Sequence, residues 1–149
     1  MRTYQELVEK AVKMNSKVSE AVLLAEIERT GISGDQLVEK MRQNYTVMED
    51  SVEQGMTGKW RSISGLVGGD AARMDTYRLC GKSLLGDRMN QAAARAIAVA
   101  EVNAGMGRIV AAPTAGSCGV LPGVLLTVRD ILNCSEEAVI RSLFTAAGL

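Results

Sequence analysis

The sequence predicts an all-α fold of about seven helices, in one domain that is expected to be incomplete at its C-terminal end. Hydrophobic residues recur at spacings of three and four through most of the 149 residues, as in helices with one buried face. Cap-forming residues and glycines separate these stretches. We expect a helical N-terminal part over residues 1–55 and a glycine-rich, site-bearing part over residues 56–149. Only residues 109–112, Ile-Val-Ala-Ala, resemble a strand.

The expected helices cover residues 4–14, 18–29, 33–54, 70–80, 87–103 and 123–132, and a last one begins at Ser135. Gly31 stands where a helix commonly ends in a left-handed residue. The Ser33–Gln36 stretch matches a capping box and opens the third helix, which Gly55 is expected to close. Ser135 is a good N-cap, followed by two glutamates that favour the positive end of a helix.

The third helix carries a narrow apolar stripe with helical spacing: Leu37, Met41, Tyr45, Met48 and Val52. Core packing is the favoured interpretation, and a seam with another subunit is the alternative.

The middle of the chain is rich in glycine, since 12 of the 15 glycines lie between residues 55 and 123. Residues 55–69 read as a loop with tight turns, in which Gly68 and Gly69 allow backbone angles that other residues resist. Residues 92–100, AAARAIAVA, carry alanine on nearly every helix face. Because small side chains let helices approach closely, we expect this helix to be buried among others.

Composition excludes several classes of function. The 17 basic and 17 acidic residues leave no basic stripe for nucleic acid. The longest apolar run has 11 residues and contains Pro122, so it is too short to span a bilayer. The N-terminus resembles no targeting segment, and we therefore expect a cytosolic protein.

The three cysteines, Cys80, Cys118 and Cys134, form no CxxC pair, and the chain has no histidine. A self-contained zinc site or Cys-His catalytic pair is therefore excluded.

The segment Pro113–Gly119, PTAGSCG, is the candidate site. Gly116 and Gly119 are expected to free the backbone on both sides of Cys118, while Thr114 and Ser117 add hydroxyls beside amide donors. A following helix N-terminus would favour the thiolate form of Cys118. The residues alone leave a nucleophilic cysteine, a metal-ligating cysteine and a purely structural turn all open. Glu101 and Asn103 interrupt an otherwise apolar helix; a satisfied buried pair or a helix-end contact is the favoured interpretation, and a role in the site is the alternative.

The stretches EVNAGMGRIVAAPTAGSCGVLPG (101–123) and SGLVGGDAARM (64–74) strongly resemble the alpha subunit or alpha domain of iron–sulfur-dependent L-serine dehydratases. The resemblance covers most of the chain from about Ser62 onward. It implies an all-helical domain that holds a [4Fe–4S] cluster, with Cys118 as the first cluster ligand. The other ligands of the family lie further on and are absent from this chain. Cys80 and Cys134 do not match ligand positions.

The resemblance also implies a lyase that dehydrates L-serine to pyruvate and ammonia, in amino-acid catabolism and gluconeogenesis. An open iron would take the substrate hydroxyl. Thr114, Ala115, Gly116 and Ser117 would bind the substrate carboxylate, and a beta subunit or domain would complete an oligomeric enzyme. No residue of this chain is assigned as the base. The pyridoxal-phosphate route, with Lys82 as the nearest Schiff-base candidate, lacks a phosphate-binding glycine run and is set aside.

Two alternatives remain. The first is an enzyme that uses Cys118 as a nucleophile, with a base from a partner chain. The second is a non-enzymatic helical interaction domain that binds through the Leu37–Val52 stripe. The apolar run at the end of the chain, near Leu149, predicts that the sequence is a fragment of a larger domain.

Overall fold

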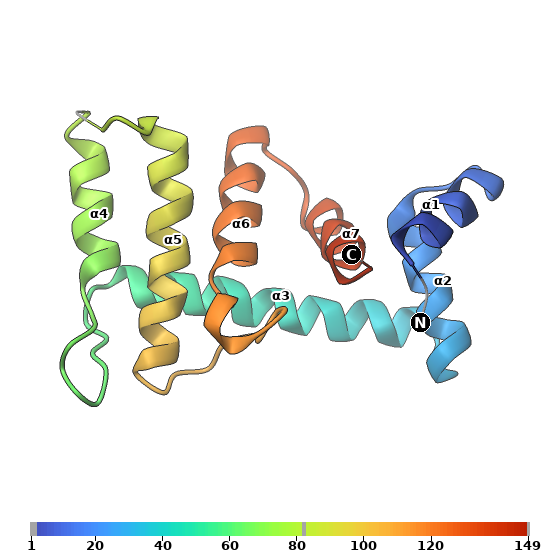
Figure 1. Ribbon diagram of the computed structural model, residues 1–149, viewed down its shortest axis with the longest axis horizontal. Helices are drawn as coiled ribbons and strands as arrows, with labels where there is room; N and C mark the ends of the chain where they lie inside the picture. The colour runs from blue at the N-terminus through green and yellow to red at the C-terminus, as the bar shows by residue number, and fades with distance from the viewer. Residues whose placement is uncertain (1–2, 82, 149) are drawn as a thin grey trace. The chain divides into compact units, whose positions relative to one another are not determined.

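The computed structural model describes residues 3–81 and 83–148, which contain seven α-helices, one short 3-10 helix and no strand (Figure 1). The α-helices are α1 (Tyr4–Lys13), α2 (Val18–Thr30), α3 (Gly34–Met56), α4 (Asp70–Leu79), α5 (Gly86–Ala104), α6 (Val120–Leu132) and α7 (Glu136–Ala147), and the 3-10 helix η1 is Ala115–Ser117. The predicted all-α class is confirmed. The strand expected over residues 109–112 is wrong, because an isolated extended segment has no strand to pair with among the described helices.

The predicted helix ends are mostly confirmed. Gly31 ends α2 in the left-handed conformation, with φ of 70°. The Ser33 hydroxyl accepts a hydrogen bond from the Gln36 amide, and the Ser135 hydroxyl accepts one from Ala138 at the start of α7. Gly55 does not close α3, which runs on to Met56. A Cβ atom on Gly55 would lie 2.2 Å from the Ala98 carbonyl oxygen, so close helix packing explains this glycine.

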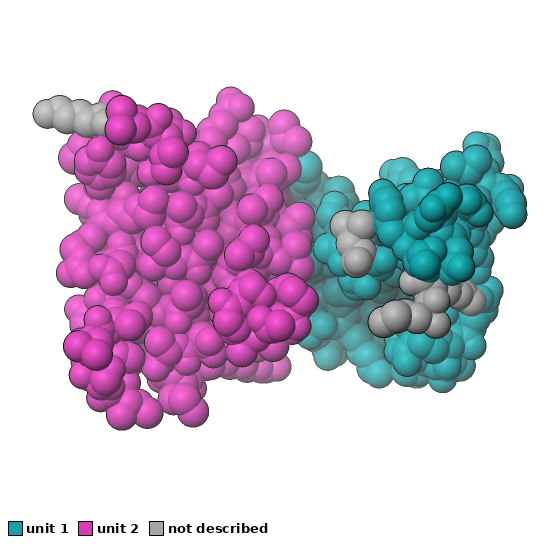
Figure 2. Space-filling model, in the orientation of Figure 1, with its two compact units in different colours: residues 1–45, 134–149 teal, residues 46–133 magenta. Residues whose placement is uncertain are grey.

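The chain divides into two compact units, residues 1–45 with 134–149 and residues 46–133 (Figure 2). In the first unit, α1 packs on α2 and α2 packs on α7. Leu37, Ile140 and Phe144 form its buried centre. Side chains that are partly buried against this centre come from α2, α3 and the segment between them: Leu23, Ile27, Ile32, Val38 and Met41.

The predicted apolar stripe of α3 is largely a core feature. Leu37, Tyr45, Met48 and Val52 are each less than 10% exposed, and Met41 is half-buried. This burial confirms core packing over a subunit seam for these residues.

The second unit is built around α5, which lies between α4 and α6 (Figure 1). The approach of α6 is very close. A Cβ atom on Gly119 would lie 2.1 Å from the Ala96 carbonyl oxygen, and one on Gly123 would lie 2.7 Å from that of Ala92. Of residues 92–100, Ala94, Ala98 and Val99 are buried, Ala100 is exposed and the other five are half-buried, so the predicted burial of this helix is confirmed in part.

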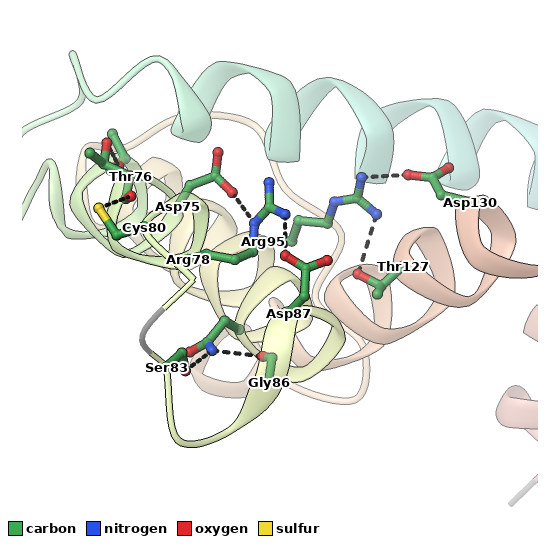
Figure 3. A network of polar contacts seen from close by, with 12 residues as sticks. Asp75, Thr76, Arg78, Cys80, Ser83, Gly86, Asp87, Arg95, Thr127 and Asp130 are labelled. Atoms are coloured by element: carbon green, nitrogen blue, oxygen red, sulfur yellow. Dashed lines mark hydrogen bonds and ion pairs between the residues drawn. The ribbon is translucent and has the colours of Figure 1, made fainter.

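Ion pairs and hydrogen bonds join the three neighbouring helices (Figure 3). Arg78 of α4 bonds to Asp75 at 2.7 Å and to Asp87 of α5 at 2.6 Å. Arg95 of α5 donates to the Thr127 hydroxyl of α6 and pairs with Asp130. Both arginine side chains are only 16% exposed, but Asp87 is 64% and Asp130 37% exposed, so these pairs add only modestly to the packing of α4, α5 and α6.

We expect Gly119→Ala to lower the free energy of unfolding by about 1–3 kcal/mol, because the added methyl group has no room against α5. Gly116→Ala is the matched control: its Cβ would meet only the Thr114 hydroxyl oxygen, at 3.8 Å. Urea denaturation followed by circular dichroism measures both. Equal midpoints for the two variants would contradict the close packing of α6 on α5.

Candidate functional site

Two glycine-bearing loops lie at the same end of the α4–α5–α6 array. Because successive helices run in opposite directions, the start of α4, the end of α5 and the start of α6 meet at this end (Figure 1). Residues 57–69 lead into α4, and residues 105–119 connect α5 to α6. The array therefore brings the predicted site segment next to the other glycine-rich stretch.

The predicted site segment forms a tight turn on the surface. It begins after a cis peptide bond between Ala112 and Pro113 and contains η1. The Ser117 amide donates to the Thr114 carbonyl oxygen at 3.2 Å, and the two hydroxyl oxygens lie 3.1 Å apart. Thr114, Ala115 and Gly116 are exposed and Ser117 is half-buried. The four residues predicted to bind substrate thus form one accessible polar turn.

Cys118 lies directly after this turn and is only 2% exposed. Gly119 is the N-cap of α6, so the thiol stands at a helix N-terminus as predicted. The expected thiolate is not favoured, however, because burial raises the pKa of the Cys118 thiol. The glycines also act differently from the prediction. Gly119 has φ of −85° and Gly116 has no positive φ, so the space beside α5, rather than backbone freedom, requires Gly119.

The last turns of α5 hold both loops. The Asn103 side-chain amide donates to the Ala115 carbonyl oxygen at 3.1 Å, which ties the site turn to α5. Glu101, two residues earlier, is 1% exposed, and its Oε1 accepts hydrogen bonds from the backbone amides of Asp70 at 2.5 Å and Ala71 at 3.3 Å. The two polar interruptions of this helix therefore have separate positioning roles.

Glu101 caps α4 from another helix. The N-cap residue of α4 is Gly69, which has φ of 81° and no side chain that could accept these hydrogen bonds. A carboxylate at a helix N-terminus is stabilised by the first amide groups and by the helix dipole. The other oxygen, Oε2, is buried without a hydrogen-bond partner in the described part of the chain. The polar interruption of an apolar helix marks Glu101 in the sequence, but no local pattern indicates the amide that it binds, 31 residues away in the chain.

Trp60 anchors the first loop against the second. A Cβ atom on Gly105 would lie 2.5 Å from the Trp60 ring, and one on Gly107 would lie 2.8 Å from it. The Arg61 guanidinium donates to the Gly58 and Trp60 carbonyl oxygens at 2.8 and 2.6 Å. Trp60 is half-buried, so its ring acts as an anchor between the two loops.

The described residues supply one candidate cluster ligand and no complete set. None of their His, Cys, Asp or Glu side chains form a group of three or more placed to hold a metal ion. Cys80 is exposed at the far end of α4 from Cys118, with its thiol near the Thr76 carbonyl oxygen (Figure 3). Cys134 belongs to the first unit. A [4Fe–4S] cluster therefore does not fit this chain alone, and Lys82 lies outside the described residues.

This chain is similar in sequence to known serine dehydratases. A family model described as serine dehydratase alpha chain matches residues 13–149. The probable L-serine dehydratase alpha chain of Bacillus subtilis is 41% identical over 147 residues, which cover 99% of this chain and 49% of that protein. The L-serine dehydratase alpha chain of Peptoniphilus asaccharolyticus is 30% identical, over 100% of this chain and 51% of that protein.

An L-serine dehydratase of Streptomyces coelicolor is also similar, at 31% identity over 99% of this chain and 32% of that protein. No solved structure matches this chain. The chain thus spans about half the length of the two alpha-chain relatives.

Glu101→Ala is expected to lower the free energy of unfolding by about 1–3 kcal/mol, because the first amide groups of α4 lose a buried charged acceptor. Glu101→Gln should cost less, since its amide oxygen can still accept both hydrogen bonds. Urea denaturation of the two variants measures the difference. If Glu101→Ala unfolds at the same urea concentration as the unsubstituted chain, Glu101 is not the cap of α4.

Burial predicts that Cys118 reacts slowly with iodoacetamide in the folded chain at neutral pH. Its labelling should accelerate only as the pH rises above the ordinary range for a thiol, because the raised pKa keeps it protonated. The exposed Cys80 is the internal control. Mass spectrometry of the labelled peptides gives both rates, and equal rates at pH 7.5 would contradict the burial of Cys118.

Proposed function

The chain belongs to the serine dehydratase alpha chain family, and on that premise we propose that it forms part of an L-serine ammonia-lyase, which converts L-serine to pyruvate and ammonia. Because the chain spans about half the length of its alpha-chain relatives, the activity is attributed to the assembled enzyme. A cytosolic location remains part of this proposal.

One observation about the site carries the proposal: an exposed polar turn lies directly before a buried thiol. Thr114 and Ser117 present hydroxyl groups on the turn, and Cys118 follows at 2% exposure. The turn is held by Asn103 and so has a defined shape before any substrate binds. Such a combination supports the recognition of a small polar substrate next to a metal-ligating sulfur.

We assign recognition of the substrate carboxylate to Thr114, Ala115, Gly116 and Ser117. Hydroxyl groups and backbone amides of a tight turn suit a carboxylate, because they donate hydrogen bonds to an anion without adding a competing charge. The Ser117 amide is already bonded to the Thr114 carbonyl oxygen, which leaves the two hydroxyl groups and the amides of Ala115 and Gly116 as donors for the carboxylate. Binding here would orient the Cα and hydroxyl group of serine.

Cys118 is proposed as one ligand of a [4Fe–4S] cluster whose other ligands lie outside this chain. Thiolates are the usual cluster ligands, and coordination to iron removes the thiol proton, so a raised pKa of the free thiol is no obstacle. An iron with an open position would supply Lewis-acid assistance to departure of the substrate hydroxyl.

Loss of the Cα proton and departure of the hydroxyl group as water give an enamine, which tautomerises to an imine and hydrolyses to pyruvate and ammonia. The base is not a histidine of this chain, because the sequence has none. We propose that a beta subunit or domain contributes to the complete enzyme. Where the beta part is a separate chain, the enzyme is an oligomer.

The alternatives are less well supported by the structure. Reactive cysteines are partly exposed with lowered pKa values, whereas Cys118 is buried and its pKa is raised. An interaction domain that binds through the Leu37–Val52 stripe would need those side chains to be accessible, and four of the five are less than 10% exposed.

The test uses the intact enzyme, purified without oxygen together with its partner chain. Cys118→Ser should lower kcat/KM for L-serine by more than about 100-fold and reduce the iron content, because a ligand is lost. Cys80→Ser, at the far end of α4, is the matched control and should keep both. A fully active Cys118→Ser enzyme, or an active unsubstituted enzyme without iron, would contradict the proposal.

A further inference from the structure

Helix α6 is apolar around most of its circumference, but only one face is covered. Pro122, Gly123, Leu126 and Thr127 are buried, and this face packs against α5. Four side chains on the other face are exposed, namely Val120 at 61%, Val124 at 49%, Val128 at 41% and Leu132 at 66%. We call these four residues the outer α6 stripe.

The outer α6 stripe is continuous and uncharged. Its residues are spaced by four, so they follow one side of the helix over roughly 18 Å. The ionisable residues of α6, Arg129 and Asp130, bond instead within the second unit, Arg129 to Glu49 and Asp130 to Arg95. A helix that is hydrophobic all round is normally buried, and a large exposed apolar stripe marks an interaction site.

The stripe begins two residues after Cys118, at the end of the array that carries the site. Three further apolar side chains are well exposed on the two loops at this end: Ile63 at 88%, Leu66 at 87% and Met106 at 79%. Any polypeptide that covers the outer α6 stripe therefore comes close to the site turn.

We propose that the outer α6 stripe is the docking surface for an amphipathic helix from the part of the enzyme that the alpha-chain relatives possess and this chain does not span. Those relatives are about twice as long as the matched region, so a polypeptide of similar size is available to cover it. The choice of occupant rests on the proposed function, because the cluster needs further ligands next to Cys118.

Two other occupants fit less well. A second copy of this chain would supply the same one candidate ligand, Cys118, and not the further ligands that the proposed cluster needs. A bilayer is disfavoured by the dimensions of the helix. Residues 115–132 have a mean hydropathy of 1.4 and are long and apolar enough to cross a membrane, but 33% of them are buried in the protein. Helix α6 itself has 13 residues, or roughly 20 Å, against about 30 Å of hydrocarbon.

The experiment co-expresses the tagged chain with the portion of the Bacillus subtilis alpha chain that lies outside the match, and quantifies co-purification. The unsubstituted pair should co-purify. Val124→Asp should reduce the recovered partner by at least about tenfold, because a carboxylate would be buried in an apolar contact. Lys40→Asp, on the exposed surface of α3, is the control and should not change recovery.

Folding is checked separately by the urea midpoint of the isolated chain, which Val124→Asp should leave unchanged because Val124 is half exposed. A lowered midpoint, unchanged recovery of the partner or no association of the unsubstituted pair would overturn the proposal. So would a dimeric mass of the isolated chain that Val124→Asp abolishes, or stripe-dependent binding to phosphatidylglycerol–phosphatidylcholine vesicles. Because association is measured rather than activity, failure here is distinct from failure of the proposed dehydratase function.

Discussion

The close approach of α5 to its neighbours is the constraint on which the rest of the second unit depends. Gly55 of α3 packs on the Ala98 carbonyl, and Gly119 of α6 packs on that of Ala96. Each contact leaves no room for a Cβ atom, so the helices have a fixed separation. Gly119 directly follows Cys118, and this contact therefore also sets where the thiol lies. The candidate site is positioned by helix packing as much as by its own loop.

Two polar side chains near the end of α5 also hold the two loops at this end of the array in place. Glu101 caps α4 through two backbone amides, and Asn103 holds the Ala115 carbonyl. The Glu101 carboxylate is buried, where hydrogen bonds to a charged group are strong and costly to lose. One helix thus orients both the glycine loop and the site turn, while its apolar faces form the core.

The sequence was most informative where the signal is local. The alanine run of α5 predicts close packing, which the contacts of Gly119 and Gly123 with Ala96 and Ala92 confirm. Gly68 and Gly69 adopt the positive φ values expected of a tight turn, 144° and 81°. Contacts between distant segments could not be predicted in this way. Gly55 was expected to end a helix, yet it serves a contact 43 residues away. The pairing of Glu101 with α4 and the burial of Cys118 likewise depend on how the helices assemble.

An exposed turn, a buried thiol and an uncovered apolar helix face lie at one end of the α4–α5–α6 array, and together they form the site that we propose for serine dehydration. The most direct measurement is a structure of the intact, anaerobically prepared enzyme with L-serine bound. The account predicts the Cys118 sulfur bonded to iron and the serine carboxylate against Thr114–Ser117. Serine bound elsewhere, or a Cys118 sulfur with no metal beside it in an active preparation, would contradict it.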